Sequence, residues 1–402
     1  MIYLDNNATT AMDPRVAAIL SEAFSQGPAN ASSQHQIGRR ARATLDSALD
    51  RIGRSLGSDL TRVDAARLVV TSGGTEANNL AITGLLPDDG ESGNTKRNAE
   101  RSTLLVSSIE HPSVLAAAES LQRTGHLVLQ IHVDAHGVVR LDHLEHLIAE
   151  SARLGKPAAL ASIMSANNET GVIQPVAEAA KICRRADVLL HVDATQSLGK
   201  IPIDLSRWGA DAVTFTPHKY HGPAGVGFLW LAPETSVRAS MHGGEQQLGT
   251  RPGTEPIALV IAAAAATEFA VQEQAAATVK MTRLRDHLET ELKKRHPSLV
   301  IHGASVDRIA STTCLSLPGA NRQTVLMALD LAGVACSSGS ACSSGSSPPS
   351  HVLISMGAAK PLVDAALRFG VSKFSTDEEI VGAVELISRK LRACSRFAHV
   401  EN

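Results

Sequence analysis

Seven short apolar runs constrain the fold of this 402-residue chain more than any other feature. Most are separated by stretches long enough for a helix or by Gly- and Pro-containing turns, and the runs cover residues 68–70, 104–106, 127–133, 160–164, 188–192, 212–215 and 226–231. Strands that are apolar on both faces and alternate with helices are typical of a largely parallel sheet covered by helices. The sequence therefore predicts an α/β protein with a mostly parallel seven-stranded sheet between helices.

The C-terminal part of the chain follows a different pattern. An Ala-rich helical region extends from residue 257 to about residue 295. Beyond it the patterns predict strands at 314–317 and 367–371 and helices at 323–331 and 377–391. Because the chain is too long for one simple core, we expect a large domain of residues 16–256 and a smaller α+β domain of residues 1–15 and 257–402.

Charge and cysteine usage narrow the class of protein. A formal net charge of -2 gives no support to a role at nucleic acid or at a membrane surface. The five cysteines include no CxxC pair, and the sixteen histidines show no HExxH spacing, so we expect no metal site and no disulfide scaffold. The chain starts without a signal-peptide pattern, and its most apolar tract, residues 257–267, is shorter than the roughly 20 residues that cross a bilayer. We expect a cytoplasmic protein.

One thiol, Cys342, stands in a run of Ser and Gly that spans residues 337–347. Such a run favours a flexible backbone, because Gly lacks a Cβ and Ser competes for local backbone hydrogen bonds. By itself the run fits either a linker with an incidental cysteine or a nucleophile on a mobile arm. The neighbouring Cys336 fits either a small buried hydrophobic residue at a strand end or a second redox thiol.

A Gly-rich turn, Ser72-Gly73-Gly74-Thr75, lies between an apolar run and a helical stretch over residues 76–85. Two glycines allow an anion to approach the backbone, and a helix start supplies free N–H groups and a positive dipole end. The turn matches neither a Walker loop nor GxGxxG. It is therefore either a phosphate site or an ordinary strand-to-helix turn.

Two charged residues follow other apolar runs. Asp193 ends one run, at the edge where parallel sheets bind ligands, although a helix cap or a turn would use the same residue type. Lys219 follows a second run, and a lysine there is either a solvated surface group or a desolvated amine able to form a Schiff base. An anion site, a carboxylate for a pyridine nitrogen and an amine for an aldehyde together match what pyridoxal phosphate requires.

Further motifs resemble those of the cysteine desulfurases, pyridoxal-phosphate enzymes of the class V aminotransferase group with the transferase fold type I. They occur in the family's order from Leu4 to the end of the chain, and the long Ser/Gly loop is similar to that of the iron–sulfur-assembly type. The matching segments are Ser-Ala-Asn-Asn-Glu-Thr-Gly at 165–171, His-Val-Asp-Ala-Thr-Gln at 191–196, His-Lys at 218–219 and Ser-Ser-Gly-Ser-Ala-Cys-Ser-Ser-Gly at 337–345.

The resemblance implies a catalytic centre. Lys219 would form the Schiff base with the cofactor and move the proton of the substrate α-carbon. Asp193 would pair with the pyridine nitrogen, and His111 would stack on the ring and transfer protons. The thiolate of Cys342 would take the sulfur of L-cysteine as a persulfide, releasing alanine, and the flexible loop would carry that sulfur to an acceptor protein.

The resemblance also implies binding roles for further residues. The phosphate would be held by Gly74, Thr75, Thr216 and His218. Gln196 and Asn168 would contact the ring oxygen or the substrate side of the cofactor. Thr254 would reach the phosphate of a neighbouring subunit, which implies a homodimer, and Arg368 would bind the substrate carboxylate.

The expected function is therefore sulfur removal from L-cysteine for iron–sulfur cluster or thio-cofactor assembly, with an iron–sulfur scaffold or thiolation protein as acceptor. Cys342 could transiently ligate an iron–sulfur cluster during transfer. The alternatives are a selenocysteine lyase or another class V aminotransferase-type enzyme, and a non-catalytic sulfur-relay protein. Lys219 argues against the last of these.

Overall fold

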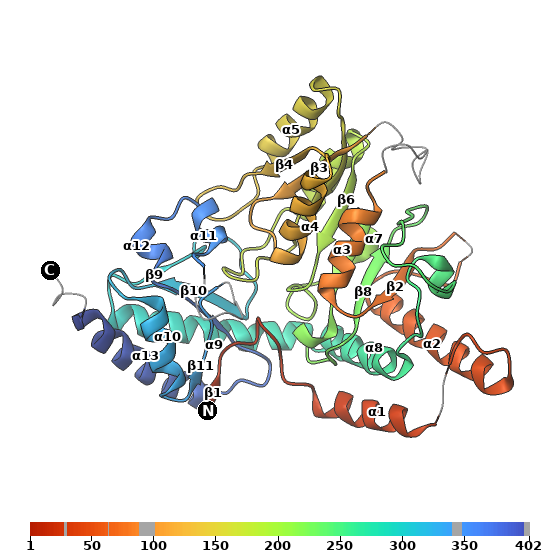
Figure 1. The fold of residues 1–402 in the computed structure, drawn as a ribbon. Coiled ribbons are helices and arrows are strands. Elements are labelled where there is room, and N and C mark those ends of the chain that lie inside the picture. Colours follow the sequence, from red (N-terminus) through yellow and green to blue (C-terminus); the bar gives the residue numbers. More distant parts are fainter. Residues whose placement is uncertain (28–29, 63, 88–100, 340–347, 398–402) are drawn as a thin grey trace.

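The computed structural model describes residues 1–27, 30–62, 64–87, 101–339 and 348–397 (Figure 1). The predicted nucleophile Cys342 lies outside these described residues.

A seven-stranded sheet forms the centre of the large layer (Figure 1). All seven predicted strands are confirmed. β8 runs antiparallel to both of its neighbours, and the other pairings are parallel. The spatial order is β2 (Arg67–Thr71), β8 (Gly227–Leu231), β7 (Ala212–Phe215), β6 (Leu189–Asp193), β5 (Ala158–Ser162), β3 (Thr103–Ser107) and β4 (Val128–Ile131).

Helices cover both faces of this sheet, which explains why the strands are apolar throughout. In β3, Leu104 and Val106 pack with α3 and α4 on one face, whereas Leu105 belongs to the core on the other face, which includes side chains of α2, α6 and α8. The helices up to residue 208 are α1 (Pro14–Ser25), α2 (Gln36–Ser55), α3 (Gly74–Gly84), α4 (Pro112–Arg123), α5 (Leu141–Arg153), α6 (Val176–Arg185) and α7 (Leu205–Trp208).

The Ala-rich region forms two helices, α8 (Ile257–Gln272) and α9 (Gln274–Arg295), which meet at 69°. α8 packs in the core of the large layer, whereas Leu284, Leu288 and Leu292 of α9 pack in a second core. Among the described residues no single helix has the length and apolar composition to cross a membrane; α8 and α9 meet that test only together, as a bent pair. The domain division at residues 256 and 257 stays a prediction.

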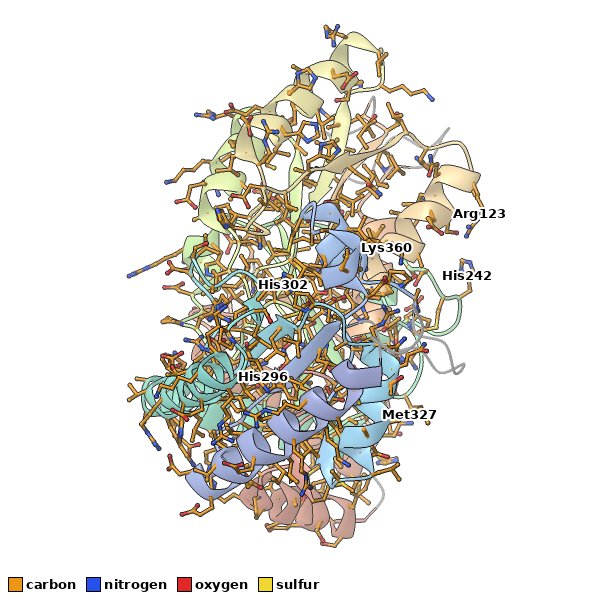
Figure 2. The ribbon with its side chains drawn as sticks, turned by 90° about the vertical axis from the view of Figure 1, so that its left-hand side faces the viewer. Arg123, His242, His296, His302, Met327 and Lys360 are labelled. Atoms are coloured by element: carbon orange, nitrogen blue, oxygen red, sulfur yellow. The ribbon has the colours of Figure 1, made fainter. Side chains whose placement is uncertain are left out.

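The second core belongs to a smaller α+β part, as predicted. Its sheets are β12-β10-β9, which is antiparallel, and the parallel pair β1-β11. His296 and His302 lie in its interior, where each ring bonds a serine hydroxyl (Figure 2). Its elements are β1 (Ile2–Tyr3), β9 (Val300–Ile301), β10 (Thr312–Ser316), α10 (Arg322–Asp330), β11 (Val334–Ala335), α11 (His351–Ser355), α12 (Lys360–Val363), β12 (Ala366–Gly370) and α13 (Asp377–Phe397).

The N-terminal segment connects the two parts. Leu4 packs in the second core, and residues 5–13 then run along the turn that follows β7. The backbone N–H of Thr10 donates to the carbonyl of His218, and that of Asp13 donates to the carbonyl of His221. This path brings the carbonyls of residues 7 and 8 beneath the same turn. Short 3-10 helices cover Pro217–Lys219 within this turn and Gln246–Gly249 before α8.

Candidate active site

A cavity of about 360 Å³ lies where the large sheet meets the smaller part. The structure brings together ten of the predicted site residues around it: Gly74, Thr75, His111, Asn168, Asp193, Gln196, Thr216, His218, Lys219 and Arg368. Most of them follow the carboxyl end of a strand. β6 and β7 are parallel and Asp193 pairs in register with Thr214, so the residues after these two strands lie at the same edge of the sheet. Residues that the sequence analysis did not assign also line it, among them Asn7, Ala8, Asn78, Gly339 and His351.

The start of α3 forms one end of the cavity. Its N-cap residue, Gly73, provides no side-chain cap, so the first turn keeps free N–H donors at Gly74 and Thr75. A Cβ on Gly227 would lie 2.4 Å from the carbonyl carbon of Gly73, so β8 and this turn pack closely. Thr216 lines the cavity beside this turn. Such a helix start suits an anion of phosphate size.

A fixed carboxylate stands at the end of β6. Asp193 is buried, and its two oxygens accept hydrogen bonds from Asn78 Nδ2 at 2.8 Å and from the N–H of Thr195 at 2.9 Å. Asn78 lies four residues after Gly74 on α3, and this helical spacing could have indicated it from the sequence. The carboxylate faces the cavity with a defined orientation.

Lys219 carries the amine of the site. Its Nζ donates to the carbonyls of Asn7 at 2.7 Å and Ala8 at 2.6 Å. Desolvation lowers the pKa of Lys219 to about 8, with Arg368 acting in the same direction and Asp193 opposing it. A large part of the lysine population is therefore neutral near pH 8, as a nucleophilic amine requires.

The side chains of His111 and His351 also line the cavity. His111 caps α4, and its Nδ1 accepts from the N–H of Ser113 at 3.1 Å. Desolvation by the surrounding protein lowers the pKa of His111, with Lys219 and His351 acting in the same direction. His351, at the start of α11, holds its Nε2 2.9 Å from the carbonyl oxygen of Glu110. No motif surrounds His351 in the sequence, so its place at the cavity could not be predicted.

Arg368 enters from β12 in the smaller part and is buried. Its guanidinium donates to Asp5 Oδ1 at 2.9 Å and to the carbonyl of Asn168 at 3.1 Å, and the carbonyl of Gly339 lies 3.5 Å away. Its Nε has no hydrogen-bond partner among the described residues. Gly339 has a φ of +86°, and a Cβ there would lie 2.5 Å from Glu169 Oε2, so glycine suits this approach to the cavity.

Three further residues that the sequence analysis discussed are not among those described at the cavity. Thr254 is exposed and is not among the described residues that line the cavity, so its assigned contact with a neighbouring subunit stays a prediction. Cys342 is outside the described residues. Cys336 packs against the second core, and burial raises the pKa of its thiol to about 12, which favours the structural interpretation.

The donors present fit pyridoxal phosphate group by group. The open helix start can accept the phosphate, the Asp193 carboxylate can hold a protonated pyridine nitrogen, and the Lys219 amine can condense with the aldehyde. The unpartnered Nε of Arg368 leaves one buried donor for a further anionic group.

The aminotransferase class-V family model matches residues 2–381. The cysteine desulfurase of Trichormus azollae is 34% identical over 404 residues, covering 100% of this chain and 96% of that protein. Among solved structures, a NifS-like protein from Rickettsia africae ESF-5 superposes with a TM-score of 0.85 at 30% identity, over 97% of this chain and 99% of that one. SspA in complex with cysteine has a TM-score of 0.76 at 27% identity, over 94% and 100% of the chains. The chain therefore belongs to the class-V aminotransferases and, within them, to the pyridoxal-phosphate-dependent cysteine desulfurases.

Proposed function

We propose that the cavity around Lys219 is the centre in which this cysteine desulfurase removes sulfur from L-cysteine. The observation that carries the proposal is a lysine amine with a lowered pKa, in one cavity with a fixed carboxylate and an uncapped helix start. When bound, pyridoxal phosphate supplies an electron sink next to the α-carbon of the substrate. The protein's own residues supply binding and proton transfer.

Binding of the cofactor is assigned to the large layer. Gly74, Thr75, Thr216 and His218 would hold the phosphate, and Asp193 would keep the ring nitrogen protonated. Gln196 and Asn168 would contact the ring oxygen or the substrate side, and His111 would stack on the ring. Desolvation, with Lys219 and Lys200 nearby, lowers the pKa of His218 to about 4, so its ring is neutral at pH 7.

Proton transfer is assigned to Lys219, whose amine is neutral often enough near pH 8 to accept a proton from the substrate α-carbon and return it. His111 would act as a second proton carrier, and its lowered pKa keeps it neutral near pH 7. Arg368 would bind the substrate carboxylate, because its unpartnered Nε is a buried donor that such a carboxylate satisfies.

Sulfur transfer is assigned to Cys342. Its thiolate would attack the sulfur of the substrate, so that an S–S bond forms and the C–S bond breaks. The electron pair of that bond remains on the substrate carbon, which takes up a proton and leaves as alanine. Cys342 lies three positions after Gly339, which lines the cavity, and three extended residues span about 10 Å. The proposed attack requires the thiol to reach a substrate next to Lys219 within that length of chain.

We further propose delivery of the persulfide sulfur to an iron–sulfur scaffold or thiolation protein in the cytoplasm, during which Cys342 could transiently ligate a cluster. A homodimer follows if Thr254, which is exposed, reaches the phosphate site of a second copy.

Borohydride reduction of the cofactor-loaded protein, followed by peptide mass spectrometry, tests the assigned site. We expect the reduced cofactor on the peptide that contains Lys219, and equal amounts of alanine and sulfide from L-cysteine with a thiol reductant. Cofactor attached to another lysine would contradict the site. Faster turnover of selenocysteine, or amine transfer to a keto acid without sulfide, would favour the alternative enzymes.

A further inference from the structure

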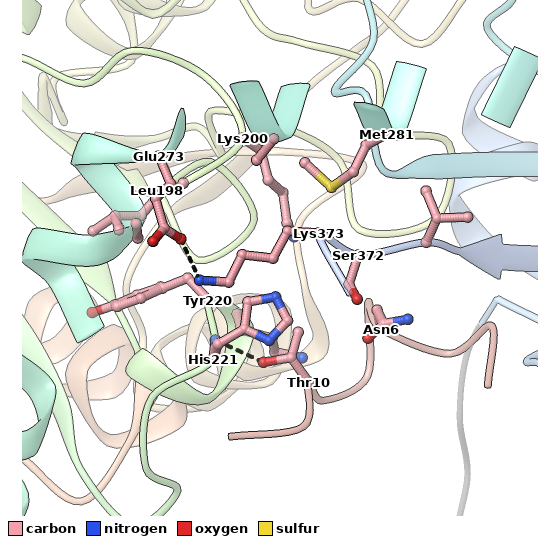
Figure 3. Close-up of a pocket in the computed structure, with 15 residues that line it drawn as sticks. Asn6, Thr10, Leu198, Lys200, Tyr220, His221, Glu273, Met281, Ser372 and Lys373 are labelled. Atoms are coloured by element: carbon pink, nitrogen blue, oxygen red, sulfur yellow. Dashed lines mark hydrogen bonds and ion pairs between the residues drawn. The ribbon is translucent and has the colours of Figure 1, made fainter. Parts of the chain in front are cut away.

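Behind Lys219 lies a second, smaller cavity of about 30 Å³, the volume of roughly one water molecule (Figure 3). Lys200 and Lys219 both line it. Lys200 stands beside Met281, near the ion pair of Lys373 with Glu273 (Figure 3). Lys200 is buried, and no carboxylate of the described residues forms an ion pair with it. An amine buried in this way needs another acceptor.

That acceptor is the side chain of Gln196. Nζ of Lys200 donates to Oε1 of Gln196 at 2.7 Å, and Nε2 of Gln196 donates to the carbonyl of Asn7 at 3.0 Å. The same carbonyl accepts from Nζ of Lys219 at 2.7 Å. A continuous chain of hydrogen bonds therefore joins Lys200 to Lys219.

The hydrogen-bonding groups of Lys200 and Asn7 determine the orientation of the Gln196 side-chain amide. A lysine amine donates to the amide oxygen, and a backbone carbonyl can only accept, so both neighbours specify the same orientation. Burial, with Lys219 and Arg368 nearby, lowers the pKa of Lys200 to about 7. A neutral amine still has hydrogens to donate, so the bond to Oε1 does not depend on the charge of Lys200.

We propose that Lys200 is a positioning residue that holds the Gln196 amide with its NH2 group toward the Asn7 carbonyl and the cofactor cavity. The inference rests on the proposed contact of Gln196 with the ring oxygen of the cofactor. In that arrangement the second hydrogen of Nε2 is free for the ring oxygen. Without a donor at position 200, only the Asn7 carbonyl still specifies that orientation, so the amide turns more readily and presents its oxygen instead.

The pH midpoint of the visible absorption of the bound cofactor reports this contact. A hydrogen bond to the ring oxygen stabilises its negative charge and so weakens proton binding at the adjacent nitrogen of Lys219. Lys200→Met keeps the apolar stem and removes the donor, and we expect it to raise the midpoint by about half a pH unit or more. Lys200→Gln keeps a donor without the charge and should stay near the wild-type midpoint.

A double variant separates positioning from a direct charge effect. If Lys200 acts through Gln196, then Gln196→Met raises the midpoint by itself, and adding Lys200→Met to it causes no further rise. Lys360→Met, an exposed lysine on α12, is the matched control and should titrate like the wild type. An unchanged midpoint in Lys200→Met, or a full shift that persists without Gln196, overturns the inference.

The measurements distinguish failure of the proposed cofactor site from failure of the proposed role of Lys200. A wild-type protein that shows no visible cofactor band contradicts the proposed site as a whole. A wild-type band with a normal titration in Lys200→Met contradicts the role of Lys200 alone. If Lys200→Met fails to fold, Gln196→Met and Lys200→Gln carry the test, because the first must shift the midpoint and the second must not.

Discussion

The two walls of the large cavity are built differently. The strand-end wall, defined by Asp193, Gln196, Thr216, His218 and Lys219, follows two neighbouring parallel strands of one sheet. A hydrogen bond donated by Asn78 of α3 orients its carboxylate, and carbonyls of the N-terminal segment accept hydrogen bonds from its amine, before any ligand binds. A rigid wall of this kind suits a resident cofactor, because binding costs little reorganisation.

The small-domain wall, defined by Asp5, Gly339, His351 and Arg368, comes from distant segments of the chain. Its Arg368 joins Ser337 through an isolated bridge, and Gly339 and His351 flank the segment that contains Cys342. We infer a division of labour from this difference: the strand-end wall would hold the cofactor, and the small-domain wall would hold the substrate. The following predictions test that division.

The largest effect is expected on the strand-end wall. Lys219→Ala removes the amine that we propose binds the cofactor aldehyde and moves the α-proton, so sulfide release should fall by about a thousandfold or more. Steady-state sulfide production measures it. Lys360→Met serves as a control for loss of a lysine, because that side chain is 84% exposed on α12. Turnover within tenfold of wild type would show that Lys219 is not the catalytic amine.

A smaller effect, mainly on KM for L-cysteine, is expected for a change in the small-domain wall. Arg368→Lys keeps a charge but loses the planar fork, so KM for L-cysteine should rise by roughly 10- to 100-fold with a smaller change in kcat. The cofactor absorption should stay unchanged. Arg308→Lys is a matched control, since Arg308 pairs with Glu289 at 2.8 Å and does not line the cavity. A cofactor-binding defect in Arg368→Lys would contradict the assignment of cofactor binding to the strand-end wall and substrate binding to the small-domain wall.

The pH dependence of cofactor attachment should follow Lys219. Because burial lowers its pKa to about 8, the neutral fraction grows as pH rises, by roughly tenfold from pH 7 to pH 9, and then levels off. Stopped-flow absorption after mixing cofactor-free protein with pyridoxal phosphate measures the rate. A rate that still climbs steeply above pH 10 would indicate an ordinary solvated lysine.

The smallest effect is expected at Glu110, whose carbonyl oxygen lies 2.9 Å from Nε2 of His351 in the small-domain wall. Burial, reinforced by Asp193, raises the pKa of Glu110 well above its ordinary value, which favours the neutral form of its carboxyl. Glu110→Gln should therefore change the free energy of unfolding by no more than about 1 kcal/mol, whereas Glu110→Ala should cost more. Denaturant unfolding measures both. Strong destabilisation by Glu110→Gln would mean that the site needs a charge there.

The sequence could predict the strand-end wall because its signals are local. Asp193 and Lys219 each follow an apolar run that forms a strand of the central sheet, and parallel strands bring such ends together. The turn at residues 72–75 and the helix after it could also be predicted from local sequence patterns. These residues line one cavity, which favours the site interpretation of each over the alternative that the sequence left open.

The small-domain wall and the chain of bonds behind Lys219 were not predictable in the same way. Asp5 and Arg368 lie 363 positions apart, and the carbonyls of Asn7 and Ala8 have no side-chain signature. The bend between α8 and α9 was also missed, because neither Gly nor Pro marks the junction at Glu273. These features depend on tertiary packing, which single-sequence patterns do not encode.

Mass spectrometry of the cofactor-loaded protein after brief exposure to L-cysteine tests the proposed sulfur transfer. We expect one added sulfur on the peptide that contains Cys342, removable by a thiol reductant, with matching alanine release. Cys342→Ser should retain the cofactor absorption but form neither product in quantity, whereas Cys336→Ser should behave like the wild type. Sulfur found on Cys336 instead, or undiminished alanine and sulfide release by Cys342→Ser, would contradict the account.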